Sequence, residues 1–326
     1  MAGRRSYFYQ AFGLTLETDR ALPNVELAQP AQPDIRITLL NQVPANSDLG
    51  ALPATLLHSG SDRRAALCSI WRYEASNHVL FEFADQTLFA LNYEATEIRA
   101  SWPPSVTLED AAVYLLGPIL GFALRRHGYV CLHSSVFALE GHAIAIAGAS
   151  GIGKSTLTAA LAKRGHAVLT DDILVLIDRD NQFQVRPGYP RLRLWPDSAM
   201  AVFGSCDALP RLCPDHPTWD KRYLALDGKF AFQAVPLPLA AVYTAGAPSE
   251  EGVTFETVER SERLIGLLAH PYACVGLDRA QRIQHFDVVS RLAKNVPLRR
   301  YHARRDLAHV DQLGEEIIKD ARQFLH

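Results

Sequence analysis

The chain of 326 residues lacks an excess of charge of either sign. Lys and Arg together number 33 and Asp and Glu together number 35, which gives a formal net charge of −2 at pH 7. Nucleic-acid-binding domains carry a basic surplus, and anionic membranes attract basic segments, so neither kind of partner is indicated. We therefore expect no nucleic-acid partner and no membrane partner.

Paired cysteines and long apolar runs are also missing. The five cysteines are Cys68, Cys131, Cys206, Cys213 and Cys274. Their number is odd and no two have C-x-x-C spacing, which argues against a disulfide framework and against a structural zinc site. The first ten residues contain no apolar core of a secretory signal, and the longest apolar run, 112–124, is too short to cross a bilayer. We expect a cytoplasmic protein with reduced thiols.

Residues 1–105 read as a mostly-β N-terminal domain. Hydrophobic residues make up 48% of the chain, enough for a sizeable core, and the length favours about two domains. Short β-rich runs occur at 34–39, 79–83 and 87–93, and frequent prolines argue against long helices. A helix is expected at 108–126, with Thr107 and Asp110 as a capping box and a kink at Pro118.

Residues 106–326 read as an α/β domain with a helical C-terminal end. Strands are expected at 129–139, 143–147, 167–170, 173–177, 239–244 and 253–258, and helices at 154–164, 279–294 and 306–324. The alternation of apolar strands with helices is typical of an α/β core.

The loop between the strand 143–147 and the helix 154–164 carries the strongest functional signal. Its sequence, Gly148-Ala149-Ser150-Gly151-Ile152-Gly153-Lys154-Ser155, fits the Walker A pattern G-x-x-x-x-G-K-[ST] at every fixed position, and Thr156 follows it. The glycines let backbone N–H groups face an anion, and the helix N-terminus adds partial positive charge. Lys154 can reach the β- and γ-phosphates of ATP, and Ser155 can ligate Mg²⁺.

Asp171 and Asp172 follow the next strand, which suits the acidic half of a phosphoryl-transfer site. One carboxylate can hold Mg²⁺ and the other can accept the proton of an attacking hydroxyl. We assign Asp172 and Ser155 to the metal and name both aspartates as catalytic candidates, without deciding which of them is the base. Neighbouring residues on a strand point to opposite faces, so a bend is needed for both carboxylates to reach the site.

Histidine and basic side chains complete the candidate site. His133 lies on the strand that precedes the phosphate-loop strand, where it can orient a carboxylate or contact a phosphate. Transfer of a γ-phosphoryl group needs cationic partners, and the candidates are Arg191, Arg193, Lys221 and Arg222. The cluster Arg299, Arg300, Arg304 and Arg305 is instead expected to be a solvated patch or a subunit contact.

These motifs together resemble the HPr kinase/phosphorylase family. The matching features are Leu132-His133, the phosphate loop, and Lys163-Arg-Gly-His-Ala-Val-Leu-Thr-Asp-Asp172, all within residues 112–177. The resemblance implies a P-loop kinase core related to phosphoenolpyruvate carboxykinase, with ATP and Mg²⁺ bound by Lys154 and Ser155 and catalytic roles for His133 and the aspartates. Because enzymes of that family assemble as oligomers, it also implies a homo-oligomer of unspecified size.

One signature of the bifunctional HPr enzymes, Glu-Val-Arg-Gly-Leu-Gly after the aspartate pair, is absent from this chain. The segment 185–197 and the N-terminal pattern look more like those of HPr-kinase-related enzymes of peptide-maturation clusters. That subgroup includes lasso-peptide kinases, which phosphorylate a serine hydroxyl of a precursor peptide. Phosphorolysis and HPr as the substrate are therefore left open.

The function predicted from the sequence is an ATP- and Mg²⁺-dependent kinase that acts on a serine hydroxyl of a peptide or protein. One alternative is a small-molecule kinase on the same core. The other is a nucleotide-gated binding module that transfers nothing, although the intact set Lys154, Ser155, Asp171 and Asp172 argues against a loss of chemistry.

Overall fold

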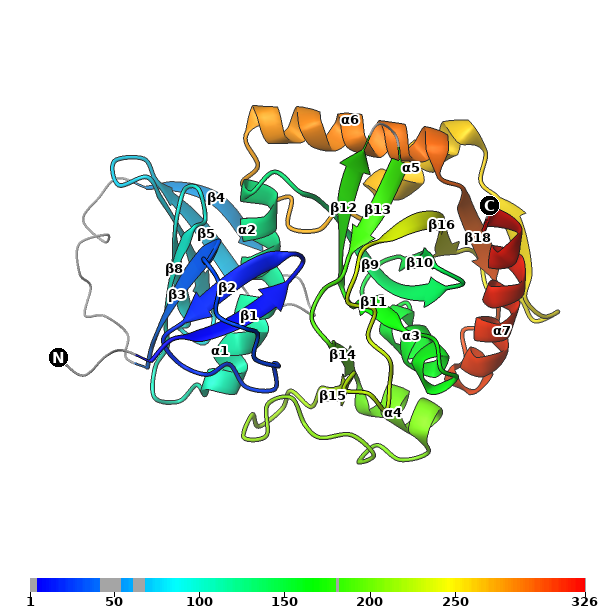
Figure 1. Ribbon diagram of the computed structural model, residues 1–326, viewed down its shortest axis with the longest axis horizontal. Helices are drawn as coiled ribbons and strands as arrows, with labels where there is room; N and C mark the ends of the chain where they lie inside the picture. Colours follow the sequence, from blue (N-terminus) through cyan, green and yellow to red (C-terminus); the bar gives the residue numbers. More distant parts are fainter. Residues whose placement is uncertain (1–4, 42–53, 61–67, 180–181, 326) are drawn as a thin grey trace. The chain divides into compact units, whose positions relative to one another are not determined.

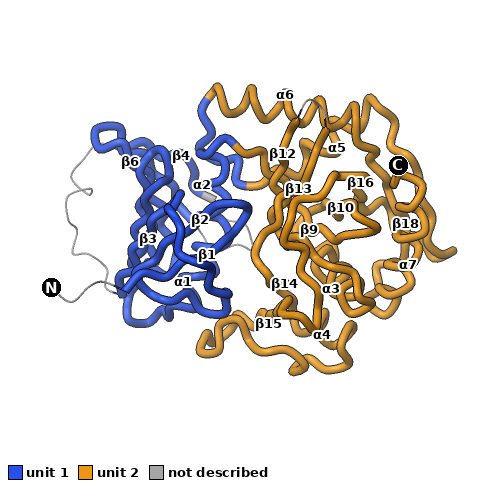
Figure 2. Tube along the Cα trace, viewed as in Figure 1, with its two compact units in different colours: residues 1–128, 273–278 blue, residues 129–272, 279–326 orange. Residues whose placement is uncertain are grey.

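The structure, a computed structural model, describes residues 5–41, 54–60, 68–179 and 182–325. The chain divides into two compact units (Figure 2): unit 1 comprises residues 1–128 and 273–278, and unit 2 comprises residues 129–272 and 279–326. The sequence placed the boundary near residue 105, and the structure has it after Gly128. The difference arises because the helical segment that follows residue 105 packs within unit 1.

The described part of unit 1 contains an eight-stranded sheet, as its mostly-β sequence indicates (Figure 1). The strand order is β1-β2-β3-β8-β7-β6-β5-β4. The strands are β1 (Tyr7–Ala11), β2 (Leu14–Thr18), β3 (Ile35–Leu40), β4 (Thr55–Gly60), β5 (Cys68–Tyr73), β6 (His78–Phe83), β7 (Leu88–Asn92) and β8 (Glu97–Ser101). β3 pairs in parallel with both β2 and β8, while the other pairs are antiparallel. Alternate residues of β3 are buried, which is the pattern of a strand that covers a core on one face.

The helical segment of unit 1 comprises α1 (Leu108–Tyr114), the π-helical turn η1 (Leu115–Ile119) and α2 (Leu120–Arg126). The capping box is confirmed, because Thr107 accepts from the Asp110 backbone N–H and the Asp110 carboxylate accepts from the Thr107 N–H. The expected kink is also present: Gly117, just before Pro118, has non-helical angles of φ −110° and ψ −106°. Phe122 packs edge-to-face on Phe81 of β6 with 5.1 Å between ring centroids, so this helix belongs to the core of unit 1.

The main sheet of unit 2 has the order β10-β9-β12-β13-β16-β18-β17, with β11 paired to β9. The strands are β9 (Val130–Leu139), β10 (His142–Ala147), β11 (Val168–Thr170), β12 (Ile173–Arg179), β13 (Gln182–Arg186), β16 (Leu237–Ala245), β17 (Thr254–Thr257) and β18 (Leu298–His302). β10 also pairs in parallel with β16, and β16 pairs in parallel with β18. The carboxyl ends of these three strands therefore meet at one edge, the usual location of a ligand site in an α/β sheet.

Helices and a short ribbon complete unit 2. They are α3 (Lys154–Lys163), α4 (Pro196–Phe203), α5 (Arg260–Leu268), α6 (Arg279–Asn295), η2 (Leu307–His309), α7 (Val310–Ala321) and η3 (Arg322–Phe324), with the ribbon β14 (Arg191–Leu194) and β15 (Arg222–Ala225). α3 packs against α7, where Gly314 allows close approach: a Cβ there would lie 3.2 Å from Cδ2 of Leu161. The sequence predicted α3, α6 and the region of α7, but not α4 or α5.

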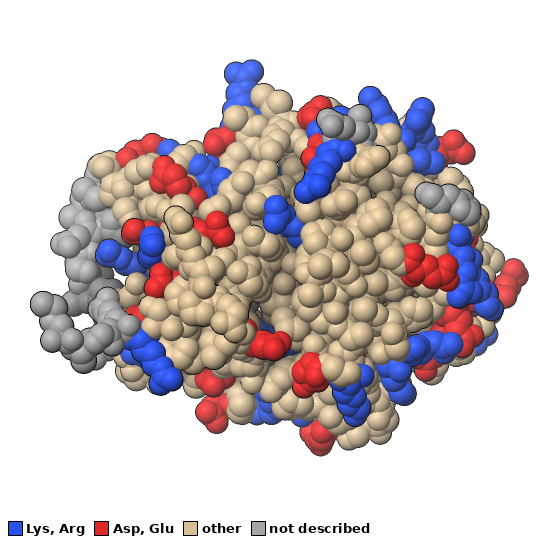
Figure 3. Space-filling view, viewed as in Figure 1, with Lys and Arg blue, Asp and Glu red and all other residues tan. Residues whose placement is uncertain are grey.

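The α/β fold expected from the sequence is present in unit 2, with helices packed on a mixed sheet. Within the described residues, no helix combines the length and apolarity needed to cross a membrane. On the face drawn in Figure 3, acidic and basic side chains of the described residues are interspersed.

Candidate functional site

The phosphate loop connects the buried strand β10 to α3, as the motif requires. Gly151 and Gly153 have φ values of +83° and +98°, a region that only glycine adopts without strain. At Gly148 the constraint is space, because a Cβ would lie 2.9 Å from Cγ2 of Ile152. The loop therefore folds as a concave turn that ends on the N-terminus of α3, where backbone N–H groups favour an anion.

Lys154 lies across this loop and is buried, with 6% of its surface exposed. Its Nζ donates to the carbonyl oxygens of Gly148 at 2.9 Å and Ala149 at 3.0 Å. Burial lowers the pKa of Lys154, and the charges of Asp172 and Asp171 partly offset that effect. The ammonium group is thus positioned to exchange carbonyl oxygens for the oxygens of a bound phosphate.

Asp171 is buried and accepts hydrogen bonds from three directions. Its Oδ1 accepts from Ser135 Oγ at 2.7 Å and from Ser155 Oγ at 2.8 Å. Its Oδ2 accepts from the backbone N–H of Arg193 at 3.0 Å. The sequence assigned Ser155 and Asp172 to the metal, whereas the structure pairs Ser155 with Asp171. Ser135 was not identified from the sequence, although it lies two residues after His133 on the same face of β9.

Asp172 has a left-handed backbone, with φ +70°, between β11 and β12. This conformation supplies the bend that adjacent carboxylates need to reach one site, and aspartate tolerates it better than most residues. Asp172 Oδ1 contacts His133 Nε2 at 2.9 Å, and Oδ2 accepts from an Arg193 N–H at 2.5 Å and from the Tyr272 hydroxyl at 3.3 Å. An uncommon backbone conformation surrounded by charged partners is typical of a functional site.

The electrostatics of this cluster favour an ionised Asp172. Burial alone raises the pKa of Asp172, but the charge of Arg193, the hydrogen bond and charge of His133 and the charge of Lys221 outweigh burial and hold it well below its usual range. Burial lowers the pKa of Arg193, but the negative charges around it, including those of both aspartates, outweigh burial and raise the pKa above its ordinary value. Asp172 therefore remains a carboxylate at neutral pH.

The four basic candidates lie on or next to the ribbon β14–β15, but they have different partners. Arg193 on β14 reaches Asp172. Lys221, just before β15, has its Nζ 5.1 Å from the ring centroid of Trp195, and its charge interacts with those of Arg193 and both aspartates. Burial, followed by the charge of Arg193, lowers the pKa of Lys221.

The other two candidates are engaged elsewhere. Arg222, the next residue along the ribbon, forms ion pairs with Asp207 at 3.0 Å and Asp220 at 3.1 Å. Arg191 is buried with its guanidinium 5.2 Å from the Tyr189 ring centroid. The charge of Lys221 acts on both aspartates, whereas the ion pairs of Arg222 direct it to Asp207 and Asp220. The structure therefore brings Arg193 and Lys221 to the site and gives Arg222 and Arg191 other contacts.

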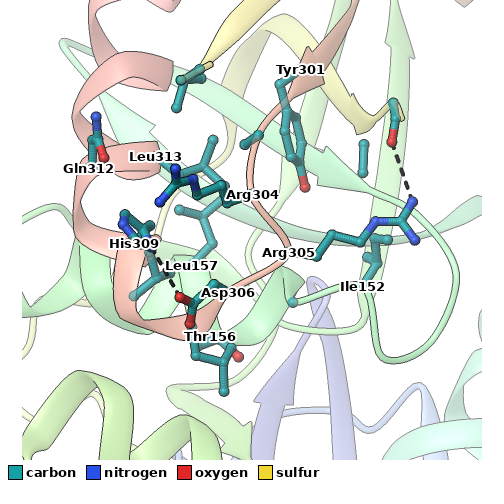
Figure 4. Close-up of a pocket in the computed structure, with 18 of the residues that line it drawn as sticks. Ile152, Thr156, Leu157, Tyr301, Arg304, Arg305, Asp306, His309, Gln312 and Leu313 are labelled. Atoms are coloured by element: carbon teal, nitrogen blue, oxygen red, sulfur yellow. Dashed lines mark hydrogen bonds and ion pairs between the residues drawn. The ribbon is translucent and has the colours of Figure 1, made fainter. Parts of the chain in front are cut away.

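A cavity of about 460 Å³ is lined in part by the phosphate loop (Figure 4). The loop and α3 contribute Ile152 and Thr156, and the segment after β18 contributes Arg304 and Arg305. Tyr301, on β18, places its ring in the same cavity. Arg304 forms an ion pair with Glu250 at 3.0 Å, and Arg305 donates to the Gly246 carbonyl oxygen at 3.4 Å. Four C-terminal arginines were expected to form a solvated patch or a subunit contact. Arg304 and Arg305 are exposed and line this cavity, whereas Arg299 is buried.

The donors around Asp171 have the chemistry that Mg²⁺ requires. The carboxylate and the Ser155 hydroxyl supply oxygen, the ligand atom that Mg²⁺ prefers. Among the described residues, no group of three or more His, Cys, Asp or Glu side chains is arranged to hold a metal ion by itself. Such a site fits an ion that is bound by one or two protein oxygens together with the phosphates of a nucleotide.

Comparisons with known proteins found little sequence similarity. No protein-family model matches the chain, and no curated protein matches it. Among solved structures, the Hpr(Ser) kinase/phosphatase from Coxiella burnetii is similar, with 15% sequence identity and a TM-score of 0.31. The match covers 59% of this chain and 96% of that one. With a TM-score this low, the function of this chain has to be argued from its own site.

Proposed function

We propose that this protein is an ATP- and Mg²⁺-dependent kinase that transfers the γ-phosphoryl group of ATP to a serine hydroxyl of a peptide or protein. The observation that carries the proposal is the hydrogen bond of 2.8 Å between Ser155 and Asp171. It joins the phosphate loop directly to the acidic pair, so the group that binds phosphate and the groups that do chemistry form one site. A glycine-rich turn without catalytic function has no need of this arrangement.

The phosphate loop lines the cavity through Ile152 and contacts the acidic pair through Ser155, so a nucleotide bound along the loop could reach both. The nucleoside would occupy the cavity lined by Tyr301 and Arg304, and the triphosphate would follow the loop toward Lys154. The γ-phosphoryl group would then point toward Asp172 and Arg193. Bound Mg²⁺, held by Ser155 and Asp171, would neutralise phosphate charge.

The transfer step needs a base, a cation and an acceptor in line. Asp172 accepts the proton of the serine hydroxyl while the serine oxygen forms a bond to the γ-phosphorus and the bond from that phosphorus to the β,γ-bridging oxygen breaks. Arg193 and Lys221 stabilise the charge on the transferring group. His133 holds Oδ1 of Asp172 at 2.9 Å and so orients the carboxylate.

The choice of a serine acceptor rests on the resemblance to HPr-kinase-related enzymes. The same resemblance favours a precursor peptide of a maturation pathway as the acceptor. A cytoplasmic location and assembly as a homo-oligomer belong to the same proposal. The proposed partners include neither nucleic acid nor membrane.

The test is incorporation of label from γ-labelled ATP and Mg²⁺ into a panel of HPr, serine-containing precursor peptides and small hydroxylated metabolites. We expect label on a peptide or protein serine, and none with Lys154→Ala. Lys163→Ala, an exposed lysine on the same helix, is the matched control and should retain activity. Label only on a metabolite would replace the serine acceptor by a small molecule. Bound ATP without transfer to any acceptor would contradict the kinase.

A further inference from the structure

Tyr272 contacts the reacting carboxylate, although nothing in the sequence distinguishes it. It lies beyond α5 in the short segment His270–Pro271–Tyr272, which runs alongside β9. The backbone N–H of His133 donates to the His270 carbonyl oxygen at 2.9 Å, and the N–H of Tyr272 donates to the Cys131 carbonyl oxygen at 3.1 Å. These two backbone hydrogen bonds fix the register of the segment against the strand that carries His133.

This register directs the Tyr272 side chain to Asp172. Its hydroxyl donates to Asp172 Oδ2 at 3.3 Å, and its ring lies edge-on to His133 with centroids 5.8 Å apart. Arg193 donates to the same Oδ2 at 2.5 Å, whereas His133 contacts Oδ1. The carboxylate is therefore held at both oxygens, and Tyr272 shares Oδ2 with the arginine.

The phenol is a hydrogen-bond donor throughout the neutral range. Burial, followed by the negative charge of Asp172, raises the pKa of Tyr272 well above its ordinary value. A group that keeps its proton cannot serve as the base, but it can hold a carboxylate in a fixed orientation.

We infer that Tyr272 is a positioning residue for Asp172, which it holds by Oδ2 when Arg193 turns toward the transferring phosphoryl group. The inference rests on the proposed function, in which Asp172 is the base and Arg193 neutralises phosphate charge. If Arg193 leaves Oδ2 for the phosphate, the carboxylate loses its strongest restraint at the moment it must accept a proton. The phenol remains on Oδ2 and keeps the plane of the carboxylate fixed.

The test compares Tyr272→Phe with the wild-type protein, using γ-labelled ATP, Mg²⁺ and a serine-centred peptide library. Since a hydrogen bond to a charged group is lost, we expect kcat to fall about tenfold. The hydrogen bond that is lost goes to Asp172 and not to the phosphate loop, so KM for ATP should stay within about twofold of the wild-type value. Replacement of Tyr272 by 4-aminophenylalanine, which restores an N–H donor at the same place, should recover most of kcat.

Tyr243→Phe is the matched control, because it removes a tyrosine hydroxyl that donates to another carboxylate of unit 2, Asp320, at 2.6 Å. It should lower the melting temperature without changing kcat. Three results would overturn the inference alone: an unchanged kcat in Tyr272→Phe, no recovery with 4-aminophenylalanine, or an equal loss of kcat in Tyr243→Phe. No label on any peptide with the wild-type protein would instead contradict the proposed function, and the inference with it.

Discussion

Replacement of Asp172 by asparagine separates the chemical role of this residue from its structural one. Asparagine tolerates the left-handed backbone at φ +70°, so the bend between β11 and β12 should persist. The amide cannot take up a proton as the carboxylate does. Loss of a general base costs a factor of about 10² to 10⁴, so we expect kcat for phosphoryl transfer to fall by at least about 100-fold.

The same substitution also removes the negative charge that Arg193 and His133 contact. A hydrogen bond to a charged group contributes about 1.5–3 kcal/mol, and the Asp172 side chain is 28% exposed, so we expect a loss of about 2 kcal/mol in the free energy of unfolding. For a unit of roughly 200 residues this corresponds to a fall of about 4–8 °C in melting temperature. ATP affinity should change less than kcat, because the side chains that hydrogen-bond the Asp172 carboxylate lie outside the phosphate loop.

The loss of stability in Asp172→Asn depends on pH, because the pKa of Asp172 is lowered in the folded protein. A carboxylate with a depressed pKa contributes its stability above the unfolded value, about 3.9, and loses it as the pH falls further toward the folded pKa. The melting temperatures of wild type and Asp172→Asn should therefore differ by a constant amount from about pH 5 to 8, and the gap should shrink below about pH 4.

Label transfer, calorimetry and ATP binding measure these three effects on one preparation. Asp178→Asn is the matched control: Asp178 lies on β12 and pairs with Arg291, so its loss should lower stability but leave kcat unchanged. A kcat for Asp172→Asn within about tenfold of wild type would refute the assignment of Asp172 as the base.

Three further predictions address the cations, the cavity and the core. The pKa of Lys221 is lowered, so its charge is lost at a lower pH than for an ordinary lysine, and kcat should decline at alkaline pH; Lys221→Arg should abolish that decline in a pH–rate profile. Tyr301→Ala should raise the dissociation constant for ATP in a titration while leaving binding of inorganic triphosphate unchanged, because the nucleoside rather than the triphosphate would contact Tyr301. Asp320→Asn should lower the free energy of unfolding by about 3–5 kcal/mol in urea denaturation, because Arg299 and Asp320 form a buried pair.

The features that were predicted from the sequence depend on local chemistry. The capping box at Thr107, the kink at Pro118 and the start of α3 at Lys154 each follow from residues within one turn of each other. For the same reason, the phosphate loop and the neighbouring acidic pair could be located without a structure.

The features that could not be predicted depend on register between distant segments. Arg193 and Arg222 look alike in the sequence, but the pairing of β14 with β15 directs one to Asp172 and leaves the other with Asp207 and Asp220. Tyr272 reaches the site only because its segment pairs with β9. Neither register has a signal in a single sequence, since each strand is only a few residues long.

Strand β9 explains why the two aspartates have different partners. His133 and Ser135 are two residues apart on it, so their side chains share one face and are separated by about 7 Å along the strand. His133 contacts Asp172 and Ser135 donates to Asp171, so the two carboxylates are held by one rigid strand on the same side. The side chain of Ser134, between them, points away and is fully buried. Because one strand holds both partners, a shift of β9 by a single residue would exchange His133 and Ser135 for side chains of the opposite face and disconnect both carboxylates at once.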